Sequence, residues 1–185
     1  GRGSTPLLVG DAGMGKSRLL HDWARSRGAL VVAARPGDAR VPYAVLARGL
    51  RVALAMTSDA TTMLDDAQAR AELARLLPEL GAAPAGPMQE ARFRLAVAKA
   101  LDVARSHGLA GLAIDDLHYA DAASIEILPA LAGTGLALIL TVRGAETPAA
   151  LMAWLRDEGG SALCEVPLPP LREVDVCELV ASLDL

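Results

Sequence analysis

The sequence predicts an α/β protein built on a parallel sheet that helices cover on both faces. Three observations predict this class. Short apolar segments alternate with helical patterns along the chain. These segments are apolar throughout, which is typical of strands buried on both faces of a parallel sheet. A glycine-rich loop directly follows the first of them.

The sequence predicts five buried strands, with a long helical insert between the second and the third. Five apolar segments are expected to form the strands: residues 6–10, 29–34, 108–116, 136–143 and 162–168. A helix is expected from about Gly15 to Arg27, with Gly28 as its C-cap. An insert of about residues 43–106 separates the second and third strands. Its helical patterns cover residues 43–56, 64–77 and 88–106.

Capping residues mark the helices of the second half. Asp121 is a suitable N-cap for a helix that runs to about Ala132. Thr147 and Pro148 open another helix, because proline is favoured at the first helical position. A last helix is expected over residues 172–183.

Length and composition indicate one domain over residues 1–185, with an aliphatic core. Hydrophobic residues make up 52% of the chain but aromatic residues only 3%. A net charge of −4 argues against direct binding to nucleic acid, which needs a basic surface. The apolar runs are too short to span a membrane. Cys164 and Cys177 lack zinc spacing, so we expect buried free thiols in a reducing cytoplasm.

The loop after the first strand matches the phosphate-binding pattern G-x-x-x-x-G-K-[ST]. Its residues are Gly10, Asp11, Ala12, Gly13, Met14, Gly15, Lys16 and Ser17. Glycines let successive N–H groups point at a phosphate, and the following helix adds its positive N-terminal end. Lys16 is expected to reach the β- and γ-phosphates and Ser17 to bind Mg²⁺, with Arg18 completing the nucleotide-binding set. The alternative is a glycine-rich turn that binds nothing.

Two acids end the third apolar strand, in the segment "LAIDD". A magnesium nucleotide needs a second anchor, which an Asp at the end of a buried strand supplies in phosphate-loop NTPases. Asp115 is the candidate for the Mg²⁺ shell, through water, and Asp116 the candidate general base. The alternative is a pair of solvated acids at a strand–helix turn. The sequence has no N-K-x-D and no L-S-G-G-Q, which argues against a GTPase and a transporter ATPase.

Together, "GDAGMGKSRLL" and "IDDLHYADAASIEIL" resemble the signal-transduction ATPases with numerous domains (STAND NTPases). More narrowly, the sequence resembles the AAA-type ATPase module of large LuxR-family transcriptional regulators and of some multidomain cyclases and kinases. The second motif of that family reads close to D-D-L-H-W-A-D-x-x-S. The sequence departs from it at Tyr119, which replaces Trp. The resemblance covers nearly the whole chain, including "EARFRLAVAKALDVAR" in the insert and "LTVRGAE" at the fourth strand.

The resemblance implies a three-layer P-loop NTPase fold with strand order 5-1-4-3-2. It also implies that Arg143, at the end of the fourth strand, is a first sensor that touches the γ-phosphate; the alternative is a surface arginine. Thr141 is a weaker candidate on the same side. For His118, a hydrogen-bonded structural role is expected rather than a catalytic one.

The function that these features imply is ATP·Mg²⁺ binding with slow hydrolysis, as the nucleotide switch of a multidomain cytoplasmic regulator. One alternative is a nucleotide-binding module without significant turnover, acting as a regulatory or oligomerisation scaffold. Another is an interaction domain with a vestigial site, which the intact "GKS" and "DD" disfavour.

The chain is expected to be a fragment that lacks the lid and effector domains of such a regulator. Its partners would be nucleotide, the other domains of the parent chain and, in the parent, a second copy. The family carries Gly-Arg-Glu before the first strand, where this sequence reads "GRGSTP". We therefore expect weak ATP binding, with a dissociation constant above roughly 10 μM, and at most weak ATPase activity.

Overall fold

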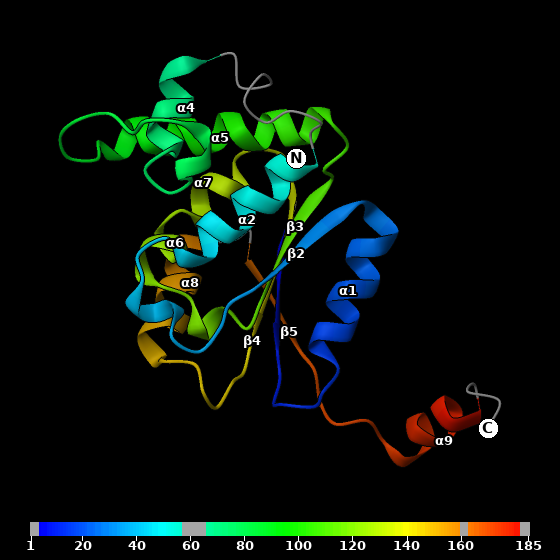
Figure 1. The fold of residues 1–185 in the computed structure, drawn as a ribbon. Coiled ribbons are helices and arrows are strands. Elements are labelled where there is room, and N and C mark those ends of the chain that lie inside the picture. Colours follow the sequence, from blue (N-terminus) through cyan, green and yellow to red (C-terminus); the bar gives the residue numbers. More distant parts are fainter. Residues whose placement is uncertain (1–3, 57–65, 160–162, 182–185) are drawn as a thin grey trace.

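The computed structural model describes residues 4–56, 66–159 and 163–181, which form an α/β fold around one five-stranded sheet (Figure 1). The strands are β1 (Thr5–Val9), β2 (Ala29–Ala33), β3 (Gly111–Asp115), β4 (Ala137–Val142) and β5 (Leu163–Pro167). The α-helices are α1 (Lys16–Arg27), α2 (Ala44–Ala55), α4 (Ala67–Leu73), α5 (Glu90–Ser106), α6 (Ala122–Glu126), α7 (Leu128–Ala132), α8 (Ala149–Gly159) and α9 (Glu173–Ala181). Short 3₁₀ turns are η1 (Asp38–Arg40), η2 (Pro78–Leu80) and η3 (Leu117–Tyr119).

The sheet is parallel at every pairing and its order is β2-β3-β4-β1-β5. Read from the other edge, this is 5-1-4-3-2, the order that the family resemblance implied. β4 therefore separates the strand before the glycine-rich loop from the strand that ends in the two acids. The insert between β2 and β3 contains α2, α4 and α5, as expected from its helical patterns.

Helices cover both faces of the sheet, and alternate residues of β1 show how. Leu7 is fully buried in the larger core, which also contains residues of α2, α5, α7 and α8, whereas Leu8 belongs with Leu20 of α1 to the smaller core on the opposite face. In Figure 1, α1 lies alone on one side of the sheet and the other helices of the core lie on the second side. Successive strand residues point to opposite faces, so one apolar strand serves both layers.

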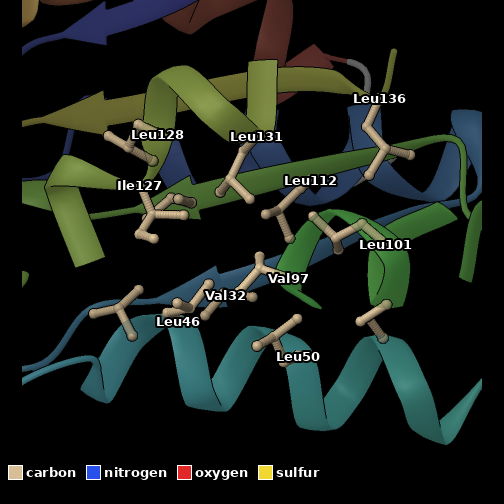
Figure 2. Packing of buried hydrophobic residues seen from close by; sticks show 14 of the residues in the cluster. Val32, Leu46, Leu50, Val97, Leu101, Leu112, Ile127, Leu128, Leu131 and Leu136 are labelled. Atoms are coloured by element: carbon tan, nitrogen blue, oxygen red, sulfur yellow. The ribbon is translucent and has the colours of Figure 1, made fainter. Parts of the chain in front are cut away.

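The larger core is aliphatic, as the composition predicts. Figure 2 shows Leu46 and Leu50 of α2 facing Val32 of β2 and Leu112 of β3, with Leu131 closing the layer above. Burial of such side chains contributes about 1.5–3 kcal/mol each to stability. This packing places the insert firmly against the sheet near the acid-bearing strand.

Three local expectations are wrong. β2 is an edge strand, half-buried for most of its length, and not buried on both faces. The helix after Asp121 divides into α6 and α7, because Pro129 in the first turn of α7 cannot donate a backbone hydrogen bond. Cys164 and Cys177 are free, but both are exposed. Among the described residues, no helix combines the length and apolar character that crossing a bilayer needs.

Candidate functional site

The candidate site lies along the carboxyl edge of the sheet. Because the strands are parallel, β1, β3 and β4 all end at this edge, with Val9 beside Val142. The glycine-rich loop follows β1, Asp115 and Asp116 follow β3, and Arg143 follows β4. The structure thus gathers these segments, which are far apart in the sequence, at the edge where open α/β sheets bind ligands.

The loop between β1 and α1 has the conformation that its glycines predict. Gly13 and Gly15 have φ values of 84° and 80°, which side chains rarely tolerate, and no atom lies within 4 Å of where their Cβ atoms would be. Gly10 is different, since a Cβ there would lie 2.9 Å from the carbonyl oxygen of Leu168. The loop is therefore open above the two later glycines and closely packed at its start.

Lys16 closes this loop. Its side chain is buried, and Nζ donates hydrogen bonds to the carbonyl oxygens of Gly10 and Asp11, both at 2.8 Å. Ser17 and Arg18 are exposed on the first turn of α1, and Arg18 lies near Asp22 on the surface of that helix. The ammonium and the serine hydroxyl are thus placed at the N-terminus of a twelve-residue helix, where anions are favoured.

Asp115 is held in place by the neighbouring strand. Its carboxylate is buried, and Oδ1 accepts hydrogen bonds from the Thr141 hydroxyl at 2.6 Å and from the Asp116 backbone N–H at 3.1 Å. The same hydroxyl accepts a bond from that N–H at 2.9 Å. Thr141, which sequence reasoning ranked low, therefore fixes the orientation of the buried acid. Both bonds end on one oxygen, which suits a carboxylate whose other oxygen receives a metal-bound water.

Asp116 has a left-handed backbone, with φ 52° and ψ 43°. Asp tolerates this conformation better than most residues. It turns the chain sharply after β3, so that the side chain reaches Arg143, whose Nη2 donates to Oδ2 at 3.3 Å. The two residues that the sequence predicted as catalytic are thus an ion pair in this structure, each about a quarter exposed.

Glu146 is a neighbour of the site that sequence reasoning missed. Nη1 of Arg143 donates to its Oε1 at 3.0 Å, and the Tyr119 hydroxyl donates to its Oε2 at 3.0 Å. These two hydrogen bonds lower the pKa of Glu146, and the carboxylates of Glu146 and Asp116 raise the pKa of Arg143. Opposite charges three residues apart in "RGAE" were the signal that could have revealed this pair.

The expectation that His118 is a hydrogen-bonded structural residue is wrong. Its side chain is 1% exposed, and among the described residues neither ring nitrogen has a hydrogen-bond partner. Nε2 lies 3.7 Å from Glu146, too far for a hydrogen bond. Burial lowers the pKa of His118, with Arg143 and Lys16 adding to this effect and Asp116 and Glu146 opposing it. The imidazole is therefore neutral in the folded protein near pH 7.

This buried imidazole predicts a loss of stability in mild acid. The unfolded chain takes up a proton at His118 near pH 6.5 and the folded protein does so only at lower pH. The contribution of the neutral His118 imidazole to the free energy of unfolding is fully present above about pH 6.5 and is lost as the pH falls. Urea unfolding from pH 7.5 to 5.5 should show a smaller decline for His118→Gln than for wild type. The exposed-residue control His107→Gln should follow wild type; identical pH profiles for all three proteins would contradict the prediction.

Asp121 joins the acid-bearing segment to the helical insert. It caps α6 as predicted, accepting from the backbone N–H and the hydroxyl of Ser124 at 2.8 and 2.7 Å. It also accepts from the backbone N–H of Tyr43 at 2.6 Å, at the start of α2. The Ser124 hydroxyl in turn accepts from the Leu46 N–H at 3.0 Å. One buried carboxylate therefore fixes two helix N-termini from segments far apart in the sequence.

The residues at this edge fit a magnesium nucleoside triphosphate. The open glycines and the N-terminus of α1 offer N–H groups to phosphate oxygens, and Lys16 offers a compact cation. Mg²⁺ prefers oxygen ligands and binds through one or two carboxylates together with substrate phosphates. Ser17 at the start of α1 and Asp115 at the end of β3 carry such oxygens, and β4 lies between β3 and β1, the strand before α1.

In comparisons with known proteins, one family model matches the chain. The family model described as the AAA ATPase domain matches residues 1–141, which run from the start of the chain into β4 and include both the glycine-rich loop and the acid pair. A search of the curated proteins gave no significant match.

Proposed function

We propose that this chain, which belongs to the AAA ATPase domain family, binds ATP·Mg²⁺ and hydrolyses it slowly as a nucleotide switch. The observation that carries the proposal is the meeting of the phosphate loop, the acid pair and Arg143 at one edge of the sheet. Phosphoryl transfer needs positioning and charge stabilisation more than covalent chemistry, and this edge supplies both.

The predicted polar residues with a chemical task have the following roles in this proposal. Lys16 leaves the carbonyls of Gly10 and Asp11 for the β- and γ-phosphates, and Ser17 binds Mg²⁺. Asp115 holds a water of the Mg²⁺ shell, and its neighbour Asp116 accepts a proton from the attacking water. Arg143 contacts the γ-phosphate and so distinguishes ATP from ADP.

The regulatory context is also part of the proposal. The motifs resemble those of STAND ATPases and LuxR-family regulators, in which an ATPase module controls neighbouring domains. We propose the same arrangement here, in the cytoplasm, with other domains of a parent chain and a second copy of it as partners. Loss of the γ-phosphate would be passed on as a movement of loops or domains.

The chain has two lysines, which makes a matched test of nucleotide binding possible. Lys16→Ala is expected to weaken ATP·Mg²⁺ binding by about tenfold or more, because a charge-assisted phosphate contact is lost. Lys99→Ala removes the same charge from α5, where Lys99 pairs with Asp66, and should leave affinity unchanged. Calorimetric titration with ATP·Mg²⁺ measures both. Equal affinities for the two variants would overturn the proposed loop function.

The ion pair between Asp116 and Arg143 favours a second candidate function. In this structure Oδ2 of Asp116 already accepts a hydrogen bond from Arg143 and is not free to accept one from the attacking water, which favours nucleotide binding over turnover. The second candidate is a nucleotide-binding module without significant turnover, serving as a regulatory or oligomerisation scaffold. Single-turnover measurements, described in the Discussion, distinguish the two.

A further inference from the structure

Arg143 is held by more than its pair with Asp116. Its two terminal nitrogens have different partners: Nη2 donates to Asp116 and Nη1 donates to Glu146. The guanidinium carbon also lies 5.8 Å from the centre of the Tyr119 ring, within the range of a cation–π contact. The guanidinium is therefore enclosed by two carboxylates and an aromatic face.

Glu146 is itself fixed in place by the turn that follows β4. Its backbone N–H and that of Thr147 both donate to the carbonyl oxygen of Arg143, at 3.1 and 2.9 Å, and the Thr147 hydroxyl donates to the same oxygen at 2.6 Å. Tyr119 occupies the second carboxylate oxygen of Glu146. Both oxygens of Glu146 are thus used, and the turn holds it at a set distance from the guanidinium.

We propose that Glu146 is the positioning residue of Arg143: it holds Nη1 so that Nη2 can leave Asp116 for the γ-phosphate of ATP. This inference rests on the proposed function, since it requires that Arg143 contacts the γ-phosphate. Nη2 is the nitrogen bonded to Asp116, directly after the acid-bearing strand, whereas Nη1 is bonded to Glu146 in the turn after β4. Binding of ATP then exchanges one partner of the guanidinium and keeps the other.

This geometry determines whether Glu146 raises or lowers the preference for ATP over ADP. Without the Glu146 carboxylate, both terminal nitrogens can turn to Asp116, because arginine forms two parallel hydrogen bonds with a carboxylate readily. The γ-phosphate must then displace a stronger pair. ADP has no γ-phosphate, so its affinity is unaffected. Glu146 therefore raises the preference for ATP over ADP.

The test compares affinities for ADP·Mg²⁺ and for the magnesium complex of an ATP analogue with an imido β–γ bridge. Arg143→Ala is expected to reduce the preference for the triphosphate strongly, and what remains comes from Lys16, the other cation proposed to contact the γ-phosphate. Glu146→Gln is expected to reduce it by about threefold to tenfold with an unchanged ADP affinity, because the charge-assisted bond to Nη1 is weakened. Tyr119→Phe frees one oxygen of Glu146 and should reduce the preference less. The control is Glu79→Gln, whose carboxylate pairs with Arg51 at a similar exposure, and it should bind as wild type does.

The outcomes separate this inference from the proposed function. If Arg143→Ala strongly reduces the preference but Glu146→Gln keeps or increases it, the positioning role is overturned and the proposed function stands. If Glu146→Gln weakens ADP binding as much as triphosphate binding, its role is general support of the fold and the inference is again overturned. If wild type binds neither nucleotide, the proposed function is overturned and this inference with it.

Discussion

Asp116→Asn is expected to reduce single-turnover hydrolysis of ATP by about 100-fold or more without weakening ATP·Mg²⁺ binding. An amide cannot take a proton from the attacking water, and such a proton transfer typically contributes 10²–10⁴-fold to rate. The backbone should not change, because Asn accepts the left-handed conformation at φ 52° as well as Asp does. Rapid-quench measurement with enzyme in excess over ATP gives the rate, and calorimetry gives the affinity.

A second Asp–Arg pair provides the control. Asp38 pairs with Arg48, and the exposed fractions of these side chains, 12% and 27%, are close to the 22% and 27% of Asp116 and Arg143. Asp38→Asn should hydrolyse ATP as wild type does. A residual rate for Asp116→Asn within a fewfold of wild type would remove the general base from the mechanism. A wild-type protein that binds ATP but shows no turnover would favour the scaffold function.

Asp121→Ala is expected to lower the free energy of unfolding by about 3–5 kcal/mol, because buried donors lose their acceptor. The backbone N–H groups of Tyr43 and Ser124 and the Ser124 hydroxyl all donate to this carboxylate, which is 2% exposed. Each buried donor left unpaired costs about 1–3 kcal/mol. Equilibrium unfolding in urea, monitored by circular dichroism, measures the loss.

The matched control for Asp121 is another aspartate at a helix N-terminus. Asp66 caps α4 by accepting from the backbone N–H groups of Gln68 and Ala69, but its side chain is partly exposed and water can replace it. Asp66→Ala should therefore destabilise the protein much less than Asp121→Ala. Asp121→Asn keeps a neutral acceptor and should fall between them. Similar losses for Asp121→Ala and Asp66→Ala would show that water reaches the Asp121 site.

The sequence was sufficient for the parts of the site that depend on local patterns. The phosphate loop follows a strand and opens a helix, so its position could be read from periodicity and spacing alone. Asp115 and Asp116 end an apolar run, which places them at the carboxyl edge of any parallel sheet. The strand order came from the resemblance, because an apolar pattern does not say which strands are neighbours.

The partners of these residues could not be predicted, because they come from distant segments. Thr141 reaches Asp115 across two paired strands, and Asp121 reaches Tyr43 in the insert. No local pattern encodes either contact. The missing hydrogen bonds of His118 have the same origin, since a lone histidine in a sequence shows neither its burial nor that its ring nitrogens find no hydrogen-bond partner in the part of the chain that the structure describes. Exposure of Cys164 reflects the position of β5 at a sheet edge, which is again a property of topology.

The order of the strands also determines when the loop gains its support as the ribosome makes the chain. β1 is synthesised before the other strands of the sheet, but Leu7 pairs with Leu140 on one side and with Glu165 on the other, so the two neighbours of β1 are the last strands of this sheet to emerge. Pairings between such distant segments form slowly and leave unpaired strand edges exposed meanwhile. The glycine-rich loop is thus translated before most of the sheet, but its strand gains both neighbours only after the rest of the sheet has been made. A nucleotide that binds beside β1 can therefore assist the folding of this sheet only after β4 has left the ribosome.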